Sequence, residues 1–320
     1  MGRLSSVVSY GWCGVDLFFV ISGFLITGIL LRSRTEDGYF RNFYMRRVLR
    51  IWPLYFAFLL LMLIVLPAAM AQSIQSARPA WAFPLFLQNL FIPRKIIGPL
   101  GITWSLAIEE QFYMAWPFFV WKLSRAALKR LLFAVLAIEP LLRILLTRFA
   151  VPISQYTHTL TRLDGLAAGC LLALLAWNGF DRAIWRRRAL QFGLPALAIA
   201  AVCASHRPLL YSAVAIAMGS VVAYSLTLSA SAKGFLAYTG RISYGLYLFH
   251  LLAFDLFDSP KMRARLHGDL GYLIASLFLT YALASISFYA FESPINGLKR
   301  YFRGDSTFAT PLAVEMAVIR

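Results

Sequence analysis

The sequence has few acidic residues and few cysteines. Only 14 of its 320 residues are Asp or Glu, and charged residues of both signs make up 14% of the chain. Soluble domains carry about a quarter charged residues, so this composition argues against a soluble domain. The three cysteines, Cys13, Cys170 and Cys203, are scattered and odd in number. They have the spacing of neither a metal site nor a disulfide framework.

Several motifs of nucleotide and metal chemistry are also missing from the sequence. The chain has no P-loop and no glycine-rich dinucleotide loop. It has no HExxH string and no Cys/His spacing of the zinc-binding kind. These absences argue against a nucleotide-driven pump and against a metal enzyme, so we expect no metal cofactor.

Long apolar runs are what the sequence has in abundance. Hydrophobic residues make up 60% of the chain, and a bilayer crossing needs about 20 mostly apolar residues in succession. Backbone groups in lipid must be satisfied within each segment, which favours helices over strands. We predict an all-α, polytopic transmembrane helix bundle over residues 1–303 and a short tail, residues 304–320. The nine expected spans are residues 12–31, 51–70, 105–121, 131–149, 163–178, 190–205, 208–228, 242–258 and 270–291.

The net charge of +17 is explained by membrane orientation rather than by nucleic acid. Of the 31 Lys and Arg residues, 20 lie in five segments outside the expected spans. We assign these segments to the cytoplasm, which predicts a multi-pass protein of the inner or plasma membrane with a cytoplasmic C-terminus. They are residues 32–50, 122–130, 179–189, 228–241 and those after 291.

The expected topology has a consequence for the N-terminus. Nine spans with a cytoplasmic C-terminus place the N-terminus outside, yet residues 1–11 carry no signal peptide. We therefore expect either that residues 12–31 insert as a reverse anchor or that a further helix precedes them.

Two adjacent acids, Glu109 and Glu110, lie in the apolar string TWSLAIEEQFYMAWP, residues 103–117. On a helix, Glu109 shares one face with Tyr113 and Trp116. Glu109 can thus face the bundle interior while Glu110 reaches the lipid headgroups. A buried carboxylate at this position could accept a proton or orient a base. The alternative is an interfacial acid paired with an arginine.

Arg162 and Asp164 stand at the outer end of the expected span 163–178. Ionisable residues within or beside membrane spans are costly, and a functional site is their default interpretation. Arg162 could pair with Glu109 or with Asp16. Such an ion pair would also be compatible with a purely structural role.

Two further residue pairs are interpreted as structural. Glu139 and Arg143 are i, i+4 partners, and we expect them to pair with each other around Pro140. Gly165 and Gly169 have the small-xxx-small spacing that lets helices pack closely.

A polar stripe runs along the expected span 242–258. Ser243, Tyr247 and His250 fall on one helix face, and His250 lies about 12 Å along the helix from residue 242. A neutral imidazole inside a bundle can act as a general base near neutral pH. A hydrogen-bonding core histidine is the alternative.

Three arginines, Arg46, Arg47 and Arg50, cluster at the cytoplasmic entry of the expected span 51–70. Arg47 and Arg50 are three residues apart and share a helix face. Arginine binds phosphate through a bidentate fork, which favours a phosphorylated cytoplasmic cofactor as the partner. Membrane anchoring alone is the alternative. Pro53 is compatible with a helix that starts close to it.

Six strings of the sequence, in order and along almost the whole chain, resemble the acyltransferase-3 family of integral-membrane acyltransferases. They are GVDLFFVISGFLIT (14–27), FYMRRVLRIWPLY (43–55), TWSLAIEEQFYMAWP (103–117), TLTRLDGLAAGCLLA (159–173), ISYGLYLFH (242–250) and FYAFESP (288–294).

This resemblance implies an enzyme that moves an acyl group, often acetyl, from cytoplasmic acyl-CoA, in particular acetyl-CoA. The acceptor would be a hydroxyl of an extracytoplasmic or cell-envelope glycan or a lipid-linked sugar. The resemblance also associates the RxxR residues, Arg47 and Arg50, with the acyl donor. We expect Glu109 and His250 to be catalytic. The other site residues that we expect are Asp16, Tyr113, Arg162, Asp164, Ser243 and Tyr247.

The family usually opens with one more helix, which makes ten spans in all. That helix carries an arginine and, further along, a histidine proposed as the catalytic base. The sequence matches the pattern from the loop after that helix. An inactive homologue is therefore one alternative. A proton-coupled transporter or flippase of a glycan or lipid is another, because it would use the same buried charges; broken helices in matching halves would favour it.

Overall fold

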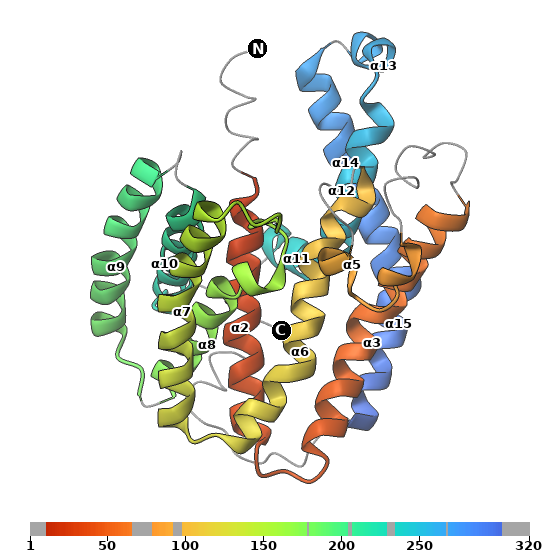
Figure 1. The fold of residues 1–320 in the computed structure, drawn as a ribbon. Helices are drawn as coiled ribbons and strands as arrows, with labels where there is room; N and C mark the ends of the chain where they lie inside the picture. Colours follow the sequence, from red (N-terminus) through yellow and green to blue (C-terminus); the bar gives the residue numbers. More distant parts are fainter. Residues whose placement is uncertain are drawn as a thin grey trace. The chain divides into compact units, whose positions relative to one another are not determined.

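The computed structural model describes residues 11–65, 79–91, 98–177, 179–203, 207–228, 234–266 and 268–302. The predicted tail, residues 304–320, lies outside them. Throughout the described ranges the regular elements are helices and no strand occurs (Figure 1). The all-α prediction is confirmed. The chain forms two compact units, one containing residues 11–39 and 108–228 and the other residues 40–107 and 234–302.

Four helical segments among the described residues are long and apolar enough to cross a membrane. Two more helices, Asp164–Ala176 and Ser243–Phe257, are apolar but shorter. The lengths and composition of these segments indicate a membrane protein. The four are Cys13–Ser33, Tyr39–Val65, Pro208–Ser225 and Asp269–Phe302.

Two helices of the first unit begin at a residue whose side chain caps the first turn. Ser124 accepts a hydrogen bond from the backbone N–H of Ala127 and begins α7, and Asp181 does the same for Ile184 at the start of α9. The elements are α2 (Cys13–Ser33), most of α6 (Thr103–Lys122), α7 (Arg125–Arg148), η4 (Thr159–Thr161), α8 (Asp164–Ala176), α9 (Arg182–Val202) and α10 (Arg207–Ser225).

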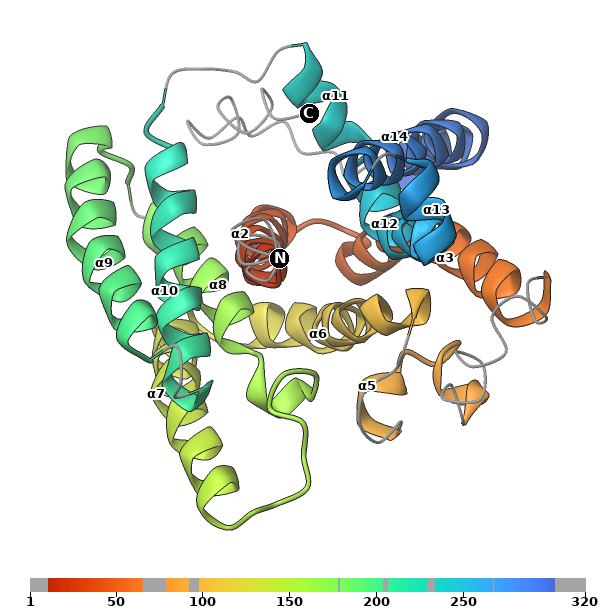
Figure 2. The same ribbon diagram turned by 90° about the horizontal axis from the view of Figure 1, so that it is seen from above.

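Helices α2 and α8 pack against each other at backbone distance. A Cβ atom added to Gly169 would overlap the carbonyl oxygen of Val20, and one added to Gly23 would overlap that of Leu166. A Cβ at Gly165 would lie 3.0 Å from the Cβ of Phe19. The packing role predicted for the two glycines of α8 is confirmed. Helix α10 contacts α2, α7, α8 and α9, and lies between α8 and α9 (Figure 2).

The second unit contains two long helices, each continued by a π-helical segment. Its elements are α3 (Tyr39–Leu60), η1 (Leu61–Val65), η2 (Ala80–Ala82), α5 (Gln88–Phe91), η3 (Pro99–Ile102), α11 (Phe235–Arg241), α12 (Ser243–Phe257), α13 (Pro260–Arg265), α14 (Asp269–Ser287), η6 (Phe288–Glu292), α15 (Ser293–Gly297) and η7 (Leu298–Phe302). Helix α12 packs along α14 and against η3.

Two local expectations are wrong. Helix α3 begins at Tyr39, so Pro53 lies well inside the helix and does not mark its start. The basic segment before residue 51 is itself helical and continues into the apolar run. Glu110 does not reach outward, because it is only 5% exposed. Residues 102–110 are all buried, so this half of α6 has no open face.

Candidate functional site

A buried ion pair joins α2 to the turn before α8. Arg162 and Asp16 approach to 3.0 Å, and neither side chain is exposed. The pair with Asp16, one of the two partners predicted for Arg162, is confirmed. A charge buried this deeply requires a partner, because an unpaired one costs several kcal/mol.

Aromatic rings surround the guanidinium of Arg162. The ring centroids of Tyr211, Tyr156 and Phe19 lie 4.6, 5.3 and 6.0 Å from its central carbon. Cations are attracted to the faces of such rings, most strongly where water is excluded. Trp12 extends the aromatic group, with its ring 5.8 Å from that of Tyr211. These rings separate the ion pair from its surroundings.

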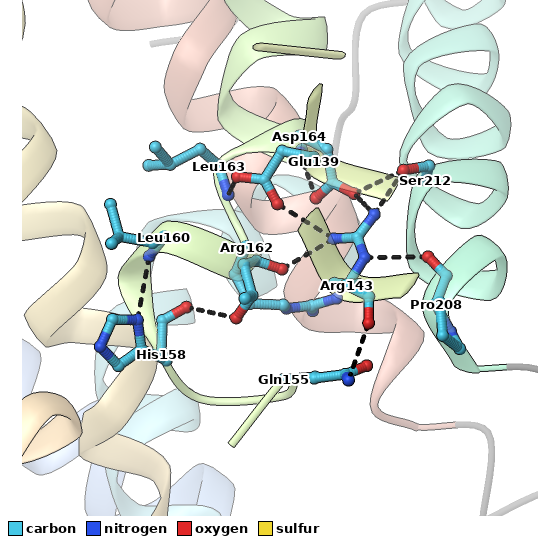
Figure 3. A network of polar contacts seen from close by, with 12 residues as sticks. Glu139, Arg143, Gln155, His158, Leu160, Arg162, Leu163, Asp164, Pro208 and Ser212 are labelled. Carbon is cyan, nitrogen blue, oxygen red and sulfur yellow. Dashed lines mark hydrogen bonds and ion pairs between the residues drawn. The ribbon is translucent and has the colours of Figure 1, made fainter. Parts of the chain in front are cut away.

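Arg143 is the centre of a second polar network, shown in Figure 3. Its Nε donates to the carbonyl oxygen of Pro208 at 2.9 Å, and one terminal nitrogen donates to Glu139 at 3.1 Å and to the carbonyl oxygen of Thr161 at 2.7 Å. The other donates to Asp164 at 2.9 Å and to Ser212. A guanidinium has five N–H donors, and each of them has an acceptor here.

The carboxylates of Glu139 and Asp164 also accept hydrogen bonds from backbone N–H groups next to them in space, at residues 163 and 165. Glu139 accepts from the backbone N–H of Leu163 at 3.2 Å, and Asp164 accepts from that of Gly165 at 3.0 Å. Ser212 donates to Asp164 at 3.1 Å. The predicted Glu139–Arg143 pair is confirmed. The sequence did not suggest, however, that Arg143 also binds Asp164.

The turn that carries Arg162 is fixed by short-range hydrogen bonds. The ring Nδ1 of His158 accepts from the N–H of Leu160 at 3.2 Å, and the hydroxyl of Thr161 donates to the carbonyl of His158 at 2.9 Å (Figure 3). Burial lowers the pKa of His158 from its ordinary value. Burial also raises the pKa of Tyr156 to about 12, so its hydroxyl is neutral at physiological pH.

The face of α6 that carries Glu109 is turned towards α2. The hydroxyl groups of Tyr113 and Ser22 form a short hydrogen bond, and the indole N–H of Trp116 donates to Thr27 at 2.8 Å. Glu109 lies one turn before Tyr113 and is 2% exposed. The predicted shared face is confirmed.

The polar stripe of α12 contains a histidine of defined tautomer. Nδ1 of His250 lies 2.6 Å from the carbonyl oxygen of Tyr247. A carbonyl can only accept, so Nδ1 carries the proton and the neutral ring has its lone pair on Nε2. The hydroxyl of Tyr247 donates to the carbonyl of Ile102 at 2.9 Å and also contacts the hydroxyl of Ser105. Ser243 is half-buried at the first position of the same helix.

The two arginines that the sequence predicts to bind the acyl donor, Arg47 and Arg50, lie before Pro53 in α3. Arg47 is partly exposed, with its guanidinium 5.9 Å from the ring centroid of Phe43, and Arg50 is exposed. Among the described residues, no group of three or more His, Cys, Asp or Glu could hold a metal ion.

The structure brings three predicted site residues, Asp16, Arg162 and Asp164, into one region, and it adds residues that were not predicted for the site. Asp16 and Arg162 form a pair directly, whereas Asp164 is joined to the same region through Arg143 and Ser212. Tyr156 and Tyr211 are also additions. The available signal in the sequence was electrostatic, because two arginines and three acids in or beside apolar segments each need polar or oppositely charged partners.

Comparison with known proteins gives these residues a context. The peptidoglycan O-acetyltransferase OatA of Listeria monocytogenes is 28% identical over 92% of this chain and 53% of its own length. The putative peptidoglycan O-acetyltransferase YrhL of Bacillus subtilis is 28% identical over 89% of this chain and 50% of its own length. The O-acetyltransferase OatA of Staphylococcus aureus is 29% identical over 98% of this chain and 58% of its own length.

The chain thus spans about half the length of the curated relatives that it matches. No solved structure matches it. The model of the acyltransferase domain matches residues 6–290, which is most of the chain. The chain therefore belongs to the acyltransferase-3 family of acyltransferase domains.

Proposed function

We propose that this protein transfers an acyl group, most simply acetyl, to a hydroxyl of a cell-envelope glycan, and that peptidoglycan is the acceptor. The match of residues 6–290 to the acyltransferase domain carries this proposal. The names of the Listeria monocytogenes and Bacillus subtilis relatives, both peptidoglycan O-acetyltransferases, support the nature of the acceptor. The apolar helices support a membrane location. A hydroxyl of a lipid-linked sugar is the alternative acceptor, and acylation would then take place before the sugar is built into the glycan.

The proposal assigns the donor to the cytoplasm and the acceptor to the other side. Acyl-CoA, in particular acetyl-CoA, is the proposed donor, and Arg47 and Arg50 are its proposed phosphate ligands because guanidinium groups bind phosphate in bidentate fashion. The predicted nine spans, the inner or plasma membrane and the cytoplasmic C-terminus belong to the same proposal. The excess of Lys and Arg in the segments assigned to the cytoplasm supports them.

The proposed chemistry is a direct transfer between an alcohol and a thioester. The hydroxyl oxygen of the glycan attacks the thioester carbonyl, the new C–O bond forms, and the C–S bond breaks. The proton leaves the hydroxyl for a base and then protonates the thiolate, so that the products are an ester and free coenzyme A. A general base accelerates such a step when it lies within hydrogen-bonding reach of the hydroxyl.

His250 is the proposed base, and Glu109 is a second proposed catalytic residue. The lone pair on Nε2 supports this role of His250, because a base must present an unprotonated nitrogen. The deep burial of Glu109 supports its role, since such a carboxylate has a large effect on neighbouring charge. Tyr247 would orient His250 through its backbone carbonyl oxygen. Tyr113 and Ser243 remain further proposed site residues.

The test measures glycan acylation in cells. Cells that lack the gene are complemented with the full-length parent or with the His250→Gln variant, and their peptidoglycan fragments are analysed by mass spectrometry. We expect acetylated fragments with the parent, and a decrease of at least about 100-fold with the variant, which is the scale of general-base catalysis. Unchanged glycan in the presence and absence of the gene would contradict the proposal. Robust acetylation by His250→Gln would remove His250 from it.

A further inference from the structure

The string FYAFESP, residues 288–294, has no role in the function proposed above, and it adopts an unusual helical conformation in the structure. It forms the π-helical segment η6, Phe288–Glu292, and the first residues of α15. Single π-helical turns inside longer helices are rare and often occur at functional sites. Glu292 ends this segment, is only 7% exposed, and accepts a hydrogen bond from the Ser287 hydroxyl at 3.1 Å.

The chain after η6 returns along the basic half of α3. The guanidinium carbon of Arg41 lies 5.7 Å from the ring centroid of Phe302, and Arg50 interacts electrostatically with Glu292. These two pairs, Arg41 with Phe302 in contact and Arg50 with Glu292 linked through charge, are nine residues apart on α3 and ten on the returning segment, in the opposite order. The two stretches therefore run antiparallel, and Lys299 lies between Glu292 and Phe302.

Lys299 shares the side of η7 that faces α3. Residues i and i+3 eclipse one another in a 3-10 helix, so Lys299 and Phe302 lie on the same face of η7. The charge of Lys299 interacts with those of Arg46, Arg47 and Arg50, and Glu292 offsets part of the repulsion. The three arginines fall within an arc of about 100° on α3, at about 100° per residue.

Four cations and one carboxylate in a small region carry an excess of positive charge. Like charges destabilise one another unless an anion joins them, and a cluster of Arg and Lys matches a ligand with several negative oxygens. We propose that Lys299 joins Arg46, Arg47 and Arg50 in binding the phosphate groups of the acyl donor. This inference rests on the proposed function for the identity of the donor. The placement of Lys299 beside α3 follows from the course of the returning segment, Phe288–Phe302.

Phosphate can come from two sources at this place, the donor or an anionic lipid headgroup. We assign it to the donor, because four converging cations exceed what one headgroup phosphate needs. The test uses the full-length chain in phosphatidylcholine nanodiscs and measures coenzyme A and pyrophosphate binding by calorimetry. A second set of nanodiscs contains phosphatidylglycerol as a competitor.

We expect Lys299→Gln to weaken coenzyme A binding about tenfold, the value of one charge-assisted hydrogen bond. Lys299→Arg should retain it. The matched control is Arg300→Gln, which removes the same charge from the next residue of η7, where the side chain is exposed and donates to Tyr301. The control should change affinity by less than about twofold, as a remote surface charge does.

The outcomes separate the inference from the function on which it rests. If Arg47→Lys weakens coenzyme A binding and Lys299→Gln does not, the donor site stands and the inference is overturned. If the parent binds pyrophosphate through Lys299 but does not bind coenzyme A, the phosphate site stands and the proposed donor is wrong. If phosphatidylglycerol abolishes coenzyme A binding and Lys299→Gln removes that competition, the site belongs to the lipid. Equal effects of Lys299→Gln and Arg300→Gln would also overturn the inference.

Discussion

Asp16 and Arg162 form an ion pair of 3.0 Å in which neither side chain is exposed. The pair joins α2 to the turn that precedes α8, and three aromatic rings cover the guanidinium. Each charge is therefore stabilised almost entirely by its neighbours in the chain. Removal of one partner leaves a buried charge, whereas removal of both leaves two neutral groups.

This pair predicts strong coupling between two substitutions. Asp16→Asn or Arg162→Gln alone should lower the free energy of unfolding by about 3–5 kcal/mol, because the partner charge stays buried. The double variant should lose clearly less than the sum of the two. Reversible denaturation in detergent measures the four free energies of the cycle. Additivity to within about 0.5 kcal/mol would show that the pair is not coupled.

The five-donor network of Arg143 predicts that lysine cannot replace arginine there. Lys has three donors, so Arg143→Lys leaves buried acceptors, among them the carbonyls of Thr161 and Pro208, without partners. We expect a loss of about 3 kcal/mol, since each unsatisfied buried group costs roughly 1–3 kcal/mol. Arg148→Lys at the exposed end of α7 is the control, with an expected change below about 0.5 kcal/mol. Reversible denaturation in detergent measures the free energy of unfolding of both variants. Equal losses of this free energy at the two positions would contradict the prediction.

The close approach of α2 and α8 predicts opposite effects of one substitution at two glycines. Gly169→Ala must push α8 away from Val20, because the new Cβ overlaps its carbonyl oxygen. We expect a loss of folded protein in size-exclusion chromatography. Gly14→Ala meets no atom within 4 Å and should stabilise α2 by about 0.5–1 kcal/mol through its higher helix propensity. A folded, unshifted Gly169→Ala variant would show that the helices do not depend on this contact.

The turn before Arg162 predicts sensitivity to acid. Burial lowers the pKa of His158 below its ordinary value of 6.5, so just below pH 6.5 the unfolded chain binds more protons than the folded chain. The free energy of unfolding should therefore fall as the pH drops through that value. In His158→Asn, the side-chain oxygen can accept from the same Leu160 N–H and does not titrate.

The measurement for His158 is the unfolding temperature between pH 8 and pH 5. The parent should lose more stability over this range than His158→Asn does. Identical pH profiles of the two proteins would mean that His158 does not contribute.

The two adjacent acids of α6 predict unequal effects on activity. Glu109 lies on the face turned towards α2, and Glu110 lies about 100° further around the helix. Glu109→Gln in the full-length protein should therefore reduce glycan acylation strongly while the protein remains folded, and Glu110→Gln should reduce it less. Mass spectrometry of released glycans provides the measurement. An essential Glu110 beside a dispensable Glu109 would refute the choice of face.

Local rules explain which contacts could be predicted from the sequence. The i, i+4 spacing of Glu139 and Arg143 fixes their contact as soon as a helix forms. The spacing of Gly165 and Gly169 predicts a close helix contact in the same way. Apolar runs predict helices because lipid leaves backbone groups no other partners.

Contacts between distant segments could not be predicted in this way. Asp164 and Ser212 lie 21 and 69 residues after Arg143, and no periodicity relates them. The helix pattern of α6 alone predicts an outward-facing Glu110, whereas neighbouring segments bury every side of α6 over residues 103–110. Tertiary packing decides such cases, and a single helix pattern does not contain it.

The acceptors of Arg143 become available in a fixed order during translation. Glu139 precedes Arg143 by four residues, whereas Ser212 follows it by 69. At about 5–20 residues per second, Ser212 is synthesised roughly 3–14 s after Arg143. Arg143 can therefore pair with Glu139 as soon as α7 forms, and Thr161 and Asp164 follow within about 20 residues. Its last two partners, Pro208 and Ser212, become available only when α10 has emerged. Progress of the ribosome to α10 therefore sets the earliest moment at which this network can close.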